Sequence, residues 1–91
     1  MKRLRSIKTA LREFFGVSGL KLFGSYARGE AVETSDVDLV IQSKRKYSIQ
    51  EITKMEIIAS QVLDGKKVDL VIESEMLPEI KAATERDMVD V

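Results

Sequence analysis

Residues 24–41 read GSYARGEAVETSDVDLVI, and the second half of this stretch predicts a strand with two acids on one face. In residues 36–42, apolar side chains occupy every second position, 37, 39 and 41, as they do in a β-strand that has one face against a core. Because successive side chains of a strand point to opposite faces, Asp36 and Asp38 share a face. The aliphatic side chains that share the other face are Val37, Leu39 and Ile41.

The two carboxylates repel each other and therefore favour a bound cation. At about 4 Å and an effective dielectric constant of about 20, the repulsion is ~4 kcal/mol. A third acid, Asp69, lies in a later apolar segment, residues 67–72, and joins the pair if the two strands are neighbours. Three carboxylates around one or two Mg²⁺ ions form the arrangement that phosphoryl and nucleotidyl transfer require. Taken alone, an Asp-x-Asp at a strand edge is more often an ordinary surface feature.

Gly24 and Ser25 follow a predicted strand at residues 20–23 and open a short turn. Glycine allows the backbone to approach a phosphate closely, and a serine at a helix N-terminus offers an N–H and a hydroxyl to phosphate oxygens. In isolation the same pair is more often a plain turn with a serine N-cap.

The composition excludes several classes of site. The chain has no cysteine and no histidine, which rules out disulfides, thiolate or imidazole metal ligands and histidine-dependent catalysis. Any metal must accept oxygen ligands, which suits Mg²⁺ or Mn²⁺. With 15 basic and 15 acidic residues the chain has no net charge, so direct nucleic-acid binding is not expected.

The chain is expected to be one cytoplasmic domain over residues 1–91 with no membrane attachment. No apolar run approaches the ~20 residues that a membrane span needs. The basic N-terminus is not followed by the apolar stretch of a signal peptide.

The pattern of apolar residues and turn signals predicts an α/β domain with a small sheet and helices packed over it. The expected elements are a helix at 3–15, a strand at 20–23, one or two helical turns from Ser25, a strand at 36–42, a helix at 49–63, a strand at 67–72, a helix starting near Ser74 and Pro78, and a short strand or tail at the end. The apolar side of the last helix is expected to comprise Leu77, Ile80, Ala83 and Thr84.

The spacing Gly24-Ser25, ten residues, Asp36-x-Asp38 and a later Asp69 resembles the signature of the polymerase-β-type nucleotidyltransferase superfamily. The stretch is similar to its minimal nucleotidyltransferase branch almost without gaps, including Ala-Arg-Gly and the Ser35 that precedes the first acid. The resemblance implies a small mixed β-sheet flanked by helices, with a polymerase-β palm-like core. Ser35 is expected to cap a strand or turn.

The resemblance also implies roles for individual residues. The expected metal ligands and catalytic acids are Asp36, Asp38 and Asp69. The expected ATP-binding residues are Gly24, Ser25 and Arg28. Asp69 is expected to act also as the base toward the incoming hydroxyl. Arg28 either contacts phosphate or pairs with Glu30 or Glu33, and the basic run 44–46 with Tyr47 is either a solvated loop or a contact for nucleotide or an acidic partner.

Larger members of the superfamily append a domain that binds the acceptor, so the resemblance implies that a partner supplies it here. Minimal members typically accompany a HEPN-type toxin protein, and the nucleotidyltransferase is the antitoxin that transfers AMP from ATP to a tyrosine of the toxin. An oligomer is left open. Two alternatives remain: a non-catalytic antitoxin that neutralises its partner by binding alone, and a stand-alone transferase for a small molecule. Clustered acids favour the enzyme, because a pure binder gains nothing from them.

Overall fold

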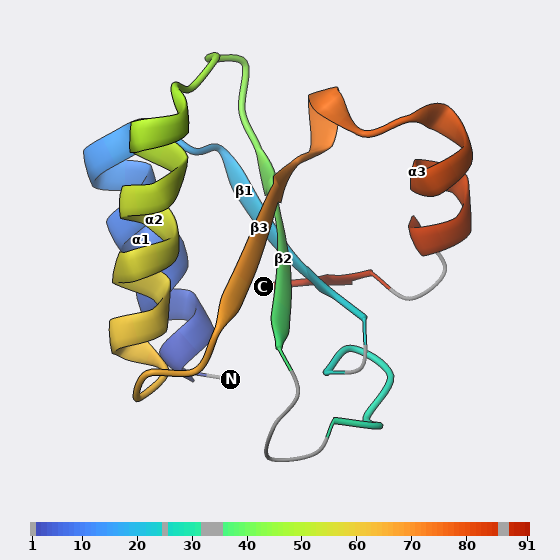
Figure 1. The fold of residues 1–91 in the computed structure, drawn as a ribbon, viewed down its shortest axis with the longest axis horizontal. Helices are drawn as coiled ribbons and strands as arrows, with labels where there is room; N and C mark the ends of the chain where they lie inside the picture. The colour runs from blue at the N-terminus through green and yellow to red at the C-terminus, as the bar shows by residue number, and fades with distance from the viewer. Residues whose placement is uncertain (1, 25, 32–35, 86–87) are drawn as a thin grey trace.

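The computed structural model describes residues 2–24, 26–31, 36–85 and 88–91, and it contains a four-stranded mixed sheet with helices on both sides (Figure 1). The helices are α1 (Lys2–Phe15), α2 (Ile49–Val62) and α3 (Pro78–Glu85), with one 3₁₀ turn at Glu73–Glu75. The strands are β1 (Gly19–Phe23), β2 (Val37–Gln42), β3 (Val68–Ile72) and β4 (Val89–Asp90). The predicted fold class is confirmed, the strands predicted at 20–23, 36–42 and 67–72 are present within one residue of those bounds, and the last residues, expected as a short strand or tail, form a short strand.

The strands lie in the order β3-β2-β1-β4. β1 pairs antiparallel with both β2 and β4, whereas β2 and β3 are parallel. A parallel pair needs a crossover connection, and α2 supplies it. This topology places the N-terminal ends of β2 and β3 side by side.

The core lies between the sheet and the pair of helices α1 and α2, which stand together on one side of it (Figure 1). The helices contribute Leu4, Ile7, Leu11, Met55 and Ala59, and Leu63 follows at the C-cap of α2; all are buried. Val37, Leu39 and Ile41 of β2 are buried as expected, and β3 adds Val68, Leu70 and Ile72. None of the helices in the described part of the chain has the length and apolar character of a membrane span.

α3 lies on the other side of the sheet, and the prediction for its apolar side needs correction (Figure 1). Leu77 and Ile80 are 60% and 50% exposed, so they do not contribute to the core. The side chains of Ala83 and Thr84 lie outside the described set. Among the described contacts, charge holds α3 to the sheet: Lys81 pairs with Glu73 at 3.5 Å, and Glu73 lies 3.9 Å from Lys21 on β1.

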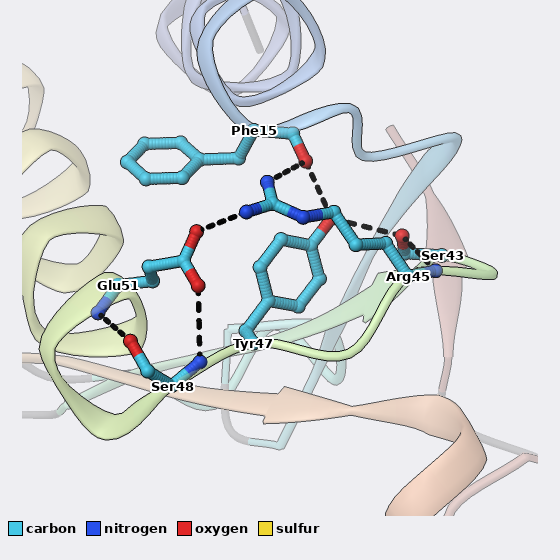
Figure 2. Close-up of polar contacts among 6 residues, drawn as sticks. All are labelled: Phe15, Ser43, Arg45, Tyr47, Ser48 and Glu51. Atoms are coloured by element: carbon cyan, nitrogen blue, oxygen red, sulfur yellow. Dashed lines mark hydrogen bonds and ion pairs between the residues drawn. The ribbon is translucent and has the colours of Figure 1, made fainter.

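Part of the basic run after β2 makes contacts within the chain, which the sequence did not indicate. Figure 2 shows the backbone carbonyl oxygen of Phe15, at the end of α1, accepting hydrogen bonds from Arg45 at 3.2 Å and Tyr47 at 2.7 Å. Arg45 also pairs with Glu51 at 2.5 Å and lies over the Tyr47 ring, 5.0 Å from its centroid. These contacts satisfy a carbonyl that the helix end would otherwise leave without a partner. Lys44 and Lys46 are exposed.

The same contacts fix the start of α2. Ser48 and Glu51 form a capping box, in which each side chain bonds the other residue's backbone N–H at 3.1 Å. The hydrogen bond from the Ser48 backbone and the charge of Arg45 together hold the pKa of Glu51 below its ordinary value. The end of α1 is thereby tied to the beginning of α2.

Replacing Met55 by Ala should lower the free energy of unfolding by about 2–4 kcal/mol, because Met55 is fully buried and the truncation leaves a cavity. Urea unfolding followed by circular dichroism measures the change. Ile57→Ala is the matched control, since Ile57 is on the same helix but 50% exposed, and it should cost less than about 1 kcal/mol. Equal losses in the two variants would contradict the placement of α2.

Candidate functional site

The predicted acids gather at the N-terminal ends of the two parallel strands. Asp38 on β2 is directly opposite Asp69 on β3 in the ladder. Asp36 lies one residue before β2, and all three side chains are partly exposed. The structure therefore places the three acids next to one another, on the face of the sheet away from the α1–α2 core.

Electrostatics show that the acids affect one another. Partial burial raises the pKa of Asp38 above its ordinary value, and the neighbouring charges of Asp69 and then Asp36 raise it further. The positive charge of Arg28 acts in the opposite direction. Ionised Asp38 is thus less stable here than in water, and a cation at this position would relieve that penalty.

Gly24 brings the backbone of the turn after β1 against Asp38. Phe23, the last residue of β1, is the cross-strand partner of Asp38, and Gly24 follows it with a φ of +76°. A Cβ at position 24 would collide with Oδ2 of Asp38 and lie 3.2 Å from its Cγ. Glycine is required twice over here, for its backbone conformation and for the space beside the carboxylate.

The turn after Gly24 carries Arg28. The Arg28 backbone N–H donates to the Gly24 carbonyl at 3.1 Å, which closes one turn, and the residues from Tyr26 to Gly29 are turn rather than regular helix. Its side chain pairs with Glu30 at 3.1 Å, one of the alternatives considered for it. Contact of Arg28 with phosphate stays a prediction. Ser25, Glu33 and Ser35 lie outside the described residues.

The donor set fits a divalent cation of the Mg²⁺ or Mn²⁺ type. Carboxylate oxygens are the ligands such ions prefer, and the opposed pair Asp38 and Asp69 presents them beside the space kept open at Gly24. Within the described residues, however, no three acidic side chains form a ready-made group that would hold one ion. The carboxylate of Asp36 instead lies 3.8 Å from the ammonium of Lys67.

Two lysines of the α2–β3 connection border the site and were not singled out from the sequence. Lys67 contacts Asp36, and Lys66 lies 5.9 Å from the ring centroid of Tyr26, in the turn after Gly24. The sequence held a signal for Lys67: Lys67 precedes β3 and lies two residues before Asp69, just as Asp36 precedes β2 and lies two residues before Asp38. It becomes meaningful only once the register of the two strands is known.

Comparison with known proteins identifies the family. A model described as the nucleotidyltransferase domain matches residues 4–91. The chain belongs to the nucleotidyltransferase family. It is 38% identical to the protein adenylyltransferase MntA of Thermococcus cleftensis over 95 residues, which cover 100% of this chain and 95% of the relative. It is also 37% identical to a provisionally named protein adenylyltransferase of Methanocaldococcus jannaschii, across 94% of this chain and 88% of that one.

Solved structures share the fold of this nucleotidyltransferase. A protein described provisionally as a minimal nucleotidyltransferase is 26% identical, with a TM-score of 0.76 over 99% of this chain and 94% of its own. The toxin–antitoxin MntA–HpeT matches with a TM-score of 0.78 at 20% identity, over 97% of this chain and 70% of that one. A toxin–antitoxin structure with AMP-PNP matches with a TM-score of 0.72 at 21% identity, and the chain spans 61% of its length. The last two likenesses establish the fold alone.

Gly24→Ala should impair nucleotidyl transfer strongly, because its Cβ would displace the Asp38 carboxylate. Gly16→Ala is the matched control, since Gly16 has a similar φ of +69° but open space around it. Urea unfolding should show a loss of about 1–2 kcal/mol for Gly16→Ala from backbone strain, and at least as much for Gly24→Ala, which adds the collision with Asp38. Only Gly24→Ala should also lose activity, and equal activity of the two variants would contradict the role of this contact.

Asp38→Asn should leave the metal-free protein equally or more stable at pH 7. A raised pKa means that the folded protein binds the Asp38 proton more tightly than the unfolded chain does, so ionised Asp38 lowers stability at neutral pH. As the pH falls through the raised pKa of Asp38, toward its pKa of about 3.9 in the unfolded chain, the carboxylate takes up a proton and the destabilisation disappears. The difference in stability between Asp38→Asn and the parent protein should therefore narrow at low pH.

Thermal unfolding in EDTA at pH 7 and pH 4 tests this expectation. Asp64→Asn is a suitable control, because Asp64 is an exposed acid in the turn after α2 with a φ of 59°, which Asn also accepts. A clearly lower midpoint for Asp38→Asn at pH 7 would show that Asp38 has a structural role.

Proposed function

We propose that this nucleotidyltransferase is metal-dependent and moves AMP from ATP to a hydroxyl group of a partner protein. The observation that carries the proposal is the close approach of Gly24 to Asp38, the acid that lies opposite Asp69 in the ladder. It brings together the two parts that the reaction needs: a backbone turn that a phosphate chain can approach, and carboxylates that can bind a metal ion beside the phosphates.

The chemistry follows from these residues. The acceptor oxygen attacks the α-phosphorus, the bond to the bridging oxygen breaks, and pyrophosphate leaves. Asp69 is proposed to take the proton of the acceptor hydroxyl, while Gly24, Ser25 and Arg28 hold the β- and γ-phosphates. Asp36, Asp38 and Asp69 would hold Mg²⁺ or Mn²⁺, which supplies neutralisation of the phosphate charge and activation of the attacking oxygen.

Two comparisons support AMP and a protein acceptor. The relatives that the chain matches over nearly all their length are named protein adenylyltransferases. A structural neighbour is described with AMP-PNP, an ATP analogue. Both observations favour ATP as the nucleotide donor.

The proposed acceptor is a HEPN-type toxin, and the chain would be its antitoxin in the cytoplasm. Support comes from the neighbours described as toxin–antitoxin structures, one of which carries a mutation of a tyrosine. A tyrosine hydroxyl is a suitable acceptor, since it has a proton for the proposed base to remove.

The test is incubation of the purified protein with Mg²⁺, ATP labelled at the α-phosphate, and an extract of the source cells as the acceptor. We expect label on a discrete protein band, which mass spectrometry would identify together with the modified residue. Label should be lost on addition of EDTA and reduced at least a hundredfold in Asp36→Asn and Asp38→Asn, since transition-state charge stabilisation of this kind is worth that much.

Asp64→Asn controls for the loss of one negative charge elsewhere and should keep full transfer. Absence of label, in an extract where the partner is present and bound, would contradict catalysis and favour an antitoxin that neutralises its partner by binding alone. Label on a small molecule instead would assign a different acceptor class.

A further inference from the structure

The register of β2 and β3 extends one step beyond the strands and brings Lys67 opposite Asp36. Val37 pairs with Val68 and Asp38 with Asp69. The backbone N–H of Val37 donates to the Lys67 carbonyl at 2.9 Å, which continues the same ladder. Two opposed pairs therefore stand next to each other: the like-charged Asp38 and Asp69, and the oppositely charged Asp36 and Lys67.

The backbone of Lys67 is fixed while its side chain stays exposed. Asp64 and Gly65 both have positive φ, and the Gly65 N–H donates to the Ser60 carbonyl at 2.8 Å, so a defined turn leads from α2 into β3. The Lys67 side chain is 74% exposed and that of Asp36 is 42% exposed. Lys67 therefore has a fixed origin beside the acids and a long, solvated side chain that can leave them.

The ion pair between Lys67 and Asp36 contributes little to the stability of the fold. Exposed ion pairs contribute little to folding, because solvent screens them and ordering the side chains costs entropy. Its effect lies in the site itself, where one ammonium offsets one of three neighbouring carboxylates. Asp36 is thereby engaged by a cation of the chain, in keeping with the lack of a ready-made three-acid group among the described residues.

We propose that Lys67 is a resident counter-cation of the acidic site. In the metal-free protein its ammonium neutralises Asp36 and competes with a divalent cation for that carboxylate. When the cation displaces it from Asp36, the ammonium adds positive charge beside the nucleotide phosphates. The inference rests on the proposed function, because it takes the acids to be the metal site. It makes Lys67 a positioning residue that balances metal affinity against nucleotide affinity.

The proposal predicts effects of opposite sign. Removing the ammonium leaves the acids more negative, so a divalent cation should bind more tightly. The same change leaves less positive charge for ATP, so the nucleotide should bind more weakly. A residue with a merely structural role would weaken both when it is replaced.

The experiment measures the two affinities separately for Lys67→Gln. Titration with Mn²⁺ at low salt, with free Mn²⁺ followed by electron paramagnetic resonance, should give about three- to tenfold tighter binding than the parent protein. Calorimetry with AMP-PNP at saturating Mn²⁺ should give binding weaker by a similar factor. The gain in Mn²⁺ affinity should shrink in about 1 M KCl, because salt screens an exposed charge. Lys67→Arg, which keeps the charge, should resemble the parent.

Lys54→Gln is the matched control, because it removes the same charge from the exposed surface of α2, on the helix side of the sheet. Unchanged or weaker Mn²⁺ binding in Lys67→Gln, or an equal gain in Lys54→Gln, would overturn the proposal. Asp38→Asn distinguishes this failure from failure of the proposed function. If Asp38→Asn loses Mn²⁺ binding while Lys67→Gln leaves it unchanged, only the role of Lys67 fails; if Asp38→Asn also leaves it unchanged, the acids are not the metal site.

Discussion

The parallel pairing of β2 with β3 is the constraint on which the rest of the molecule depends. In both strands the first, third and fifth residues are aliphatic and buried, so packing them against α1 and α2 turns the acid at the second position to the other face. A slip of one residue in the register would place carboxylates in the core and is strongly disfavoured. The hydrophobic effect thus fixes which acids are opposed, although none of them contributes to the core.

This arrangement has an electrostatic cost that the chain offsets only in part. Asp38 faces Asp69 at the same level of the sheet, and its raised pKa reflects burial together with the two neighbouring acids. Arg28 and Lys67 bring positive charge to the cluster from two different connections, each exposed enough to move. Because the carboxylates repel one another in the absence of a cation, binding a cation releases more free energy than it would at a neutral site. Local destabilisation of this kind is typical of functional sites.

Much of this could be predicted from the sequence, because strand alternation and glycine chemistry are local signals. The two-residue period predicted the buried face of β2 and the shared face of Asp36 and Asp38, whereas the place of Gly24 in the site came from the family resemblance. The tie from Arg45 and Tyr47 to the Phe15 carbonyl could not be predicted, since it depends on where α1 ends relative to α2. The exposure of Leu77 and Ile80 has a similar cause: an apolar spacing indicates a helix face but not whether another element covers it.

The division of the sheet into two faces also determines how its function can be tested. One face, covered by α1 and α2, holds the main cluster of buried apolar residues on which stability depends, although Val40 on the opposite face is also buried. The other carries the acids, and their partial exposure means that replacing one of them leaves the core packing intact. In a domain this small, which buries only about 60–65% of its unfolded surface, most substitutions that affect function would also affect folding. Here the residues proposed for function and those that stabilise the fold lie on different faces. If an acid-to-amide variant keeps its stability but loses transfer, the loss therefore reports on chemistry rather than on the fold.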